Sequence, residues 1–150
     1  MSPEFYKCSI QSDKNKCDWE KVTPPVAFTN VYQGYYDLWG ITNYDYNHTT
    51  KSLNTRQQIY RCPDNCDKDS NWKEFTSSKS FNKLYIDKDY IYGSNYELID
   101  NKWKNNYYKC SNTKDKSCAN NWSDITDSQD TTDQSAITKL KENSTYTINA

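Results

Sequence analysis

The sequence predicts an all-β protein made of three similar units of about 50 residues, each a four-stranded blade of the propeller type. One cysteine-containing element occurs three times, and a spacing of 53 residues relates the first two units over more than twenty positions. The segments between polar turns are short and rich in aromatic and β-branched residues, which is typical of strands. Four strands for each period of 40–50 residues are typical of propeller blades.

The recurring element is Tyr-x-Cys, a second cysteine, and then Trp-x-x-(apolar)-Thr. Its three copies are Tyr6-Lys7-Cys8 with Cys17 and Trp19; Tyr60-Arg61-Cys62 with Cys66 and Trp72; and Tyr108-Lys109-Cys110 with Cys118 and Trp122. All six cysteines of the chain belong to it. We therefore expect two neighbouring strands in each unit, joined by a cysteine-bearing turn.

The middle strand and the strand after it also repeat. Phe28, Tyr32 and Leu38-Trp39-Gly40 match Phe81, Tyr85 and Ile91-Tyr92-Gly93. After an insertion of about six residues in the polar run 127–135, Lys139-Leu140 and Tyr146 match Lys83-Leu84 and Tyr90. No segment has a convincing helical pattern, so strands are expected there too. The units span about 6–58, 59–106 and 107–150 of a single domain, residues 1–150.

Composition limits the function. The 150 residues carry a net charge of −1, and 14 Tyr, 5 Trp and 4 Phe predict an aromatic core. The absence of a basic excess argues against nucleic-acid binding, and no apolar run is long enough to span a membrane. A single histidine, His48, argues against multi-histidine metal sites. No catalytic motif, metal or cofactor site is predicted, so the protein is not expected to be an enzyme.

The cysteines predict three short-range disulfides, each pairing the two cysteines of one copy. A zinc site is the competing interpretation, and the unequal spacing within the copies and the lack of histidines disfavour it. Disulfides persist in oxidising compartments, so we expect a secreted protein whose leader is missing from this sequence. Three sequons, at Asn47, Asn121 and Asn143, are consistent with a glycoprotein, although such triplets also arise by chance in a chain rich in Asn, Ser and Thr.

Several of these motifs resemble a known repeat. Gln58–Pro63 with Cys66, Asn71-Trp72, Asn82–Ile86 and Tyr90–Asn95 together resemble one tectonin repeat, of the cysteine-bearing kind found in fish-egg lectins. Tyr36–Thr42 resembles the Trp-Gly strand of the preceding repeat. The resemblance covers most of residues 6–126. It implies a β-propeller and a secreted protein that binds glycans.

Three blades are too few to close a propeller ring. The chain begins with a Tyr-x-Cys strand and ends after Tyr146-Thr147-Ile148. We therefore expect the N-terminal strand of one copy to complete the last blade of another, in a head-to-tail ring or filament. Two alternatives stay open: the chain is a fragment of a longer propeller, or it is a β-trefoil built from three units.

The candidate ligand residues are aromatic and amide side chains. Trp103 has no counterpart in the repeat and lies among lysines and amides such as Asn105, which suits stacking on a sugar; packing within the hairpin is the alternative. Tyr44 and Tyr46 lie in a similar extended hairpin. Trp39, Tyr92 and Asn95 are further candidates, although the repetition of Trp39 and Tyr92 favours packing in the blade core, as it does for Trp19, Trp72 and Trp122.

Acidic residues at three-residue spacing form one more pattern, made of Asp124, Asp127, Asp130 and Asp133. A calcium loop is disfavoured, because the glycine and closing glutamate of an EF-hand are absent. Two function classes remain. The first is a secreted lectin with weak, multivalent sites, and the second is a structural subunit of an extracellular, glycosylated assembly.

Overall fold

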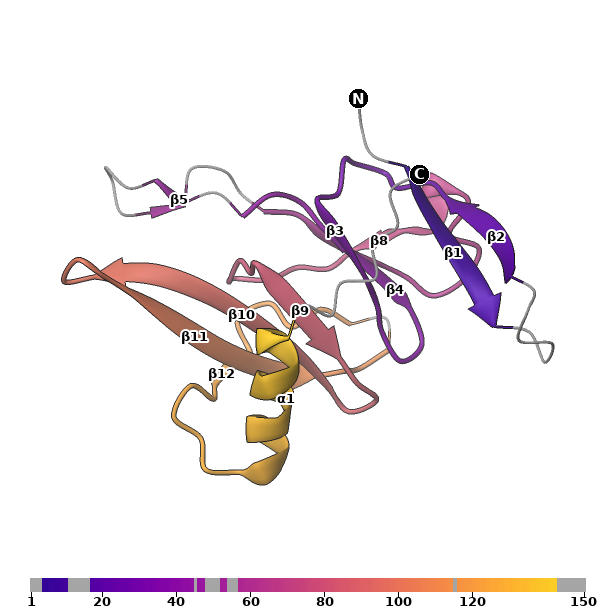
Figure 1. Cartoon of the computed structure of the whole chain (residues 1–150). Helices are drawn as coiled ribbons and strands as arrows, with labels where there is room; N and C mark the ends of the chain where they lie inside the picture. The colour runs from indigo at the N-terminus through magenta and orange to yellow at the C-terminus, as the bar shows by residue number, and fades with distance from the viewer. Residues whose placement is uncertain are drawn as a thin grey trace.

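The computed structural model describes residues 4–10, 17–44, 46–47, 52–53, 57–114 and 116–142. Antiparallel strands dominate them (Figure 1). Sheet I contains β3 (Asn30–Gln33), β4 (Leu38–Ile41), β7 (Ile59–Cys62) and β8 (Lys73–Glu74). Sheet II contains β9 (Lys83–Ile86), β10 (Tyr90–Ile99), β11 (Lys102–Ser111) and β12 (Ser123–Asp124). Two two-stranded sheets pair β1 (Phe5–Ile10) with β2 (Cys17–Val22), and β5 (Tyr46–Asn47) with β6 (Ser52–Leu53).

Each four-stranded sheet is a meander whose strands neighbour one another in chain order. A sheet begins with the middle strand and ends with the Trp-x-x-(apolar)-Thr strand, so the sheets are offset by two strands from the units 6–58, 59–106 and 107–150. The reason is that the cysteine turn joins two antiparallel neighbours, β7 to β8 and β11 to β12. The pair β1–β2 has the same sequence element and is therefore the second half of such a sheet.

The 53-residue repeat is present in the backbone hydrogen bonds. The Gly34 amide donates to the Asp37 carbonyl over 2.7 Å, and the Asp87 amide donates to the Tyr90 carbonyl over 3.0 Å. A phenylalanine ring also covers the strand glycine of each sheet, because a Cβ at Gly40 would collide with the ring of Phe28. Gly93 and Phe81 form the same contact in sheet II. Only a residue without a side chain fits beneath these rings.

The sheets pack face to face in one row, with β1–β2 first, then sheet I, sheet II and a helix (Figure 1). Three apolar clusters fill the spaces between them. The first joins β1–β2 to sheet I through Phe5, Val22, Phe28, Val31, Leu38 and Trp72. The second joins sheet I to sheet II through Tyr32, Trp39, Ile59, Phe75, Phe81, Leu84 and Ile91. The third joins sheet II to the helix through Tyr92, Tyr107, Ile125, Ala136 and Leu140.

The helix corrects one expectation. Lys139-Leu140 was expected to continue the repeat as a strand, but it belongs to α1 (Thr131–Lys141). The side chain of Asp130 caps the helix by accepting hydrogen bonds from the amides of Thr132 and Asp133. Ala136 and Leu140, four residues apart on one helix face, are buried. Helix formation and docking therefore prevail over the weak strand pattern.

Of the three expected four-stranded blades, the described residues contain two four-stranded sheets, and their other strands pair as the two-stranded sheets β1–β2 and β5–β6. The expected last strand, around Tyr146, lies outside the described residues. The described strands form no barrel, which the β-trefoil alternative would require. A short 3₁₀ helix, η1 (Asp69–Asn71), precedes β8.

Two of the three expected disulfides are confirmed. Cys62 is bonded to Cys66 and Cys110 to Cys118, with Cα–Cα distances of 5.9 and 6.2 Å. Each closes the turn between two neighbouring strands, so the zinc interpretation is wrong for these four cysteines. The side chains of Cys8 and Cys17 lie outside the described residues.

Candidate functional site

The strands β10 and β11 extend well beyond the rest of sheet II and form a projecting hairpin (Figure 1). Only Ile91–Ser94 of β10 pair with β9, whereas the residues after Ser94 pair with β11 alone. Asp100 and Asn101 close the hairpin with φ values of 50° and 61°. Two consecutive residues with positive φ favour the tight primed turns of hairpins, and Asp and Asn tolerate this conformation.

Three aromatic side chains form a row on this hairpin, named here the aromatic row: Tyr44, Tyr96 and Trp103. The ring centroids of Tyr44 and Tyr96 are 5.0 Å apart, and those of Tyr96 and Trp103 are 5.2 Å apart, both in edge-to-face geometry. The Tyr44 hydroxyl donates to the Tyr96 carbonyl over 2.7 Å. Trp103 is 50% exposed. The row therefore presents a fixed indole to solvent.

Amide side chains flank the row on both faces of the hairpin. The register opposes Asn105 to Tyr96, so the exposed Asn105 shares the face of Trp103. Asn95 and the buried Asn106 lie on the reverse face, where Asn106 donates to the Oδ1 of Asn95 over 3.3 Å and to Glu97 over 3.0 Å. Asn105 is thus the amide placed to act together with Trp103.

The fold brings together part of the candidate set. Trp103 and Asn105 share one face of the hairpin, Tyr44 packs against Tyr96 on that hairpin, and Asn95 lies on its reverse face. The side chain of Tyr46 lies outside the described residues. The sequence interpretation missed Tyr96, although the strand alternation that gives Trp103 and Asn105 a common face also includes Tyr96 once the hairpin register is known.

Trp39 and Tyr92 are fully buried, which supports the packing role rather than ligand contact. Trp39 lies against Phe75, with ring centroids 5.0 Å apart, and beneath the guanidinium of Arg61. Burial raises the pKa of the Tyr92 hydroxyl well above its usual range. Within the described part of the chain, neither the Trp39 Nε1 nor the Tyr92 hydroxyl has a hydrogen-bond partner.

The recurring tryptophans differ in their surroundings. Trp72 is buried against Phe28, and Trp122 is partly buried against Phe81, with ring centroids 5.1 and 4.7 Å apart. Both therefore pack in the core, as the alternative to a binding role expects. Trp19 is 53% exposed on the outer face of β1–β2, where no preceding sheet covers it in the described structure.

A cavity of about 820 Å³ lies at the edge of the contact between sheets I and II, named here the junction cavity. Its walls come from five separate segments of the chain. The lining residues are Tyr36, Asp37, Arg61, Pro63, Lys73, Glu74, Lys88, Asp89, Asn112, Lys114, Lys116 and Ser117. Sequence interpretation missed this site, because its residues are distant in sequence and only the packing of the two sheets brings them together.

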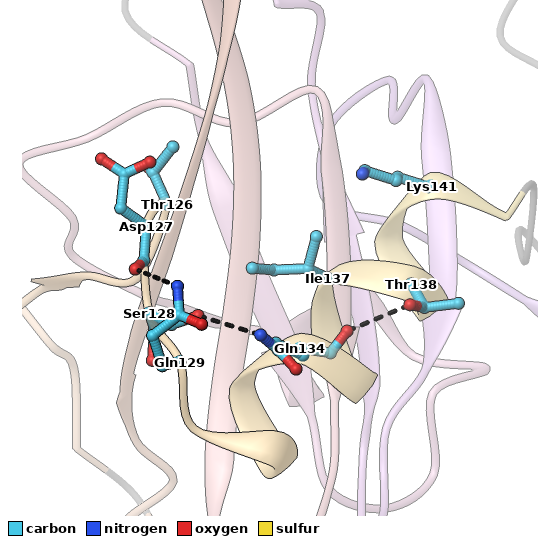
Figure 2. A pocket seen from close by; sticks show the side chains of 8 residues that line it. All are labelled: Thr126, Asp127, Ser128, Gln129, Gln134, Ile137, Thr138 and Lys141. Atoms are coloured by element: carbon cyan, nitrogen blue, oxygen red, sulfur yellow. Dashed lines mark hydrogen bonds between the residues drawn. The ribbon is translucent and has the colours of Figure 1, made fainter.

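A second, smaller recess of about 370 Å³ lies between α1 and the loop that follows β12 (Figure 2). Its polar side chains mainly form hydrogen bonds with other residues that line the recess. Gln134 donates to the Ser128 carbonyl over 3.5 Å, and Thr138 donates to the Gln134 carbonyl over 3.0 Å. These contacts order the loop around α1. The recess therefore has a structural explanation that needs no ligand.

The regularly spaced aspartates also have structural partners. Asp124 accepts from the hydroxyl and the amide of Thr126, and these bonds lower the pKa of its carboxyl group. Asp130 caps α1, and Asp133 pairs with Lys109 over 2.8 Å. These partners explain three of the four acidic residues without calcium. In the described part of the chain, no three His, Cys, Asp or Glu side chains are grouped as metal ligands would be.

No protein-family model matches the chain, and neither does any curated protein or solved structure. Among the described residues, no helix is long and apolar enough to cross a membrane.

Proposed function

We propose that this chain is a carbohydrate-binding protein and that the aromatic row is its sugar site. The observation that carries the proposal is the half-exposed indole of Trp103, held edge-to-face against Tyr96 near the end of the projecting hairpin. The C–H groups on one face of a pyranose carry partial positive charge and pack on the electron-rich face of an indole. The exposed Asn105 beside Tyr96 supplies a donor and an acceptor for ring hydroxyls.

The row joins two sheets, which supports a binding role for it. Tyr44 follows β4 of sheet I, whereas Tyr96 and Trp103 belong to the hairpin of sheet II. The Tyr44 hydroxyl bond to the Tyr96 backbone fixes the row before any ligand arrives. A fixed site loses little conformational entropy on binding, which favours the recognition of small, polar ligands such as sugars.

Glycan-array binding compares the two half-exposed tryptophans of the chain. We expect sugar-dependent signals for the wild-type protein, at least a tenfold loss for Trp103→Ala, and no loss for Trp19→Ala, which removes an indole of similar exposure far from the row. Trp103→Phe should retain part of the binding, because it keeps a smaller aromatic face. Equal losses in both alanine variants, or no sugar signal with intact disulfides, would contradict the proposal.

An extracellular location is part of the same proposal. Two disulfides close surface turns, and such bonds persist in oxidising compartments. Asn121, in the sequon that ends at the first residue of β12, is exposed and accessible to glycosylation. Comparing the intact mass of secreted material before and after deglycosylation tests this. An unmodified mass together with free thiols would contradict it.

A second candidate function is a structural subunit that associates with further copies of itself. One observation favours it: β1–β2 has only two strands, whereas β7 and β11, which carry the equivalent Tyr-x-Cys element, are each paired on both sides. Edge strands with unpaired backbone groups readily accept another strand. Light scattering tests this candidate, because a monomer of 17.7 kDa at all concentrations would exclude it.

A further inference from the structure

The junction cavity is built by segments that the fold brings together from most of the chain. The turn before β4 supplies Tyr36 and Asp37, strands β7 and β8 supply Arg61 and Lys73, and the turn between β9 and β10 supplies Lys88 and Asp89. The loop closed by the disulfide between Cys110 and Cys118 supplies Asn112, Lys114, Lys116 and Ser117. The cavity is distinct from the aromatic row, with which it shares no lining residue.

Arg61 fixes two of the walls. Its side chain is 8% exposed, and its Nε donates to Asp37 over 2.7 Å. The same guanidinium donates to the Thr113 carbonyl over 3.2 Å and to the Oδ1 of Asn112 over 3.3 Å. The planar guanidinium thereby holds the turn before β4 and the disulfide loop at a set distance. Arg61 is a positioning residue for the cavity, because most of its N–H donors are already engaged.

Asn112 fixes the third wall. Its side-chain amide donates to the Asp87 carbonyl over 2.8 Å, and its backbone amide donates to the Asp89 carbonyl over 2.8 Å. The turn that carries Lys88 is therefore tied to the same loop as Lys114 and Lys116. The cavity is pre-formed, so a ligand would not have to order its walls.

The charge of the cavity is positive. Arg61 and Asp37 neutralise each other, which leaves four lysines against two carboxylates among the lining residues: Lys73, Lys88, Lys114 and Lys116 against Glu74 and Asp89. Within the described ranges, none of these four ammonium groups lies in an ion pair. A concave surface with a net charge concentrates ligands of the opposite sign.

An aromatic face stands beside these cations. Tyr36 is 61% exposed, and its ring is held edge-to-face by Tyr35 with centroids 4.6 Å apart. Free phosphate or sulfate would need only the lysines, whereas a ligand that uses Tyr36 as well must carry an apolar ring face next to its negative charge. A sulfated or carboxylated sugar ring has both features.

We propose that the junction cavity binds an acidic sugar of an anionic polysaccharide, with its sulfate or carboxylate facing Lys114 and Lys116 and its ring on Tyr36. This site goes beyond the neutral sugar site proposed above and does not depend on it. Variants of Trp103 should leave it intact, and variants of the cavity should leave the aromatic row intact, so the two proposals fail separately.

Titration calorimetry with four probes tests the class of ligand. We expect the cavity to bind at least one of two acidic probes. Heparin hexasaccharide carries sulfates and carboxylates, whereas hyaluronan hexasaccharide carries carboxylates alone. The tighter binding of the two shows which anion the cavity prefers. Neutral chitohexaose and inorganic sulfate should bind at least tenfold more weakly than the better of the two. Raising the salt from 50 to 500 mM should weaken that binding at least tenfold, because exposed ion pairs are screened.

Matched variants test the place of binding. Lys114→Gln with Lys116→Gln should weaken the acidic hexasaccharide at least tenfold, whereas Lys68→Gln with Lys139→Gln, which removes two exposed lysines outside the cavity, should change it less than twofold. Tyr36→Ala should weaken the hexasaccharide and leave the binding of inorganic sulfate unchanged. Circular dichroism checks that each variant keeps the wild-type fold.

Three results would overturn the proposal: no binding of either acidic hexasaccharide, equal losses in both pairs of lysine variants, or tighter binding of a single-stranded oligonucleotide of matched charge. The second result would mean attraction to the general cationic surface. The third would assign the cavity to nucleic-acid phosphates instead.

Discussion

Sheet I and sheet II present equivalent faces to different neighbours. Sheet I buries the face with Trp39 and Phe75 against sheet II, whereas sheet II buries the equivalent face, with Tyr92 and Ile125, against α1. The equivalent cations are Arg61 and Lys109, at corresponding places in the Tyr-x-Cys strands. Arg61 stacks over Trp39 at 4.6 Å, and Lys109 lies over the ring of Tyr90 at 4.5 Å.

The difference between the two cations follows from what each neighbour offers. The adjoining sheet turns backbone carbonyls and an amide oxygen toward Arg61, whose several donors satisfy them together with Asp37. The helix offers one carboxylate, Asp133, which the single ammonium of Lys109 satisfies over 2.8 Å. The comparison teaches that the position of Arg61 and Lys109 in the repeat lies at two kinds of junction. The cation at each junction matches the hydrogen-bond acceptors of the neighbouring element.

The largest expected effect comes from breaking the junction between the sheets. Arg61→Met leaves Asp37 as an uncompensated charge, because the two side chains are only 8% and 6% exposed. We expect a loss of about 3–5 kcal/mol in the free energy of unfolding. Urea unfolding followed by tryptophan fluorescence measures it.

A double variant serves as the control for this prediction. Asp37→Leu with Arg61→Met removes both charges, so it should be less destabilised than Arg61→Met alone. If the double variant lost as much stability as the sum of the two single variants, the pair would not act as a unit, and the role assigned to Arg61 would be wrong.

Breaking the junction between sheet II and α1 should reduce the free energy of unfolding by a smaller amount. Asp133 is buried, and Lys109 is partly exposed. Burial raises the pKa of Asp133, but the hydrogen bonds from Lys109 and Ser128 outweigh it and hold that pKa below the ordinary 3.8. The bond to Asp133 also raises the pKa of Lys109 above 10.5. Asp133→Asn should cost about 1–3 kcal/mol, the scale of a lost charge-assisted hydrogen bond.

The pH dependence follows from these shifts. The contribution of Asp133 is fully present above its unfolded pKa of 3.8 and is lost as the pH falls through its lower folded pKa. The contribution of Lys109 is present below pH 10.5 and is lost as the pH rises through its higher folded pKa. The stability difference between wild type and Asp133→Asn should therefore be constant at neutral pH and shrink below pH 3.8. A difference that stayed constant at acid pH would contradict this role for the pair.

The sequence predicts much of sheets I and II, because their strands are set by local patterns that occur twice. The repeat alone matches Phe28 to Phe81 and Gly40 to Gly93, and these residues form the same ring-over-glycine contact in both sheets. The prediction from the repeat fails at α1, where Lys139-Leu140 matches the repeat in sequence but not in structure. The helix depends on the cap at Asp130 and on burial of Leu140 against sheet II, and the burial is a tertiary contact that no local pattern contains.

The candidate sites divide in the same way. The sequence predicts Trp103 and Asn105 as ligand residues because this segment has no counterpart in the repeat. The two side chains lie on the same face of β11. Tyr96 needed the hairpin register, which depends on a turn at Asp100-Asn101. The junction cavity cannot be predicted without knowing how the two sheets pack, since Tyr36 and Lys114 are 78 residues apart in the chain. Local alternation finds exposed aromatics, whereas a cavity between sheets exists only after tertiary packing.

The smallest expected effect separates the formation of α1 from its docking. Asp130→Ala removes the cap that accepts from the Thr132 and Asp133 amides and should cost about 1 kcal/mol. Because the apolar contacts of Leu140 remain, α1 should stay docked and show faster amide hydrogen exchange in its first turn only. Sheet I should not respond, since its face is covered by sheet II. Faster exchange in β3 and β4 would mean that the two junctions are coupled through sheet II. The junctions would then differ in their chemistry, but they would not open independently of each other.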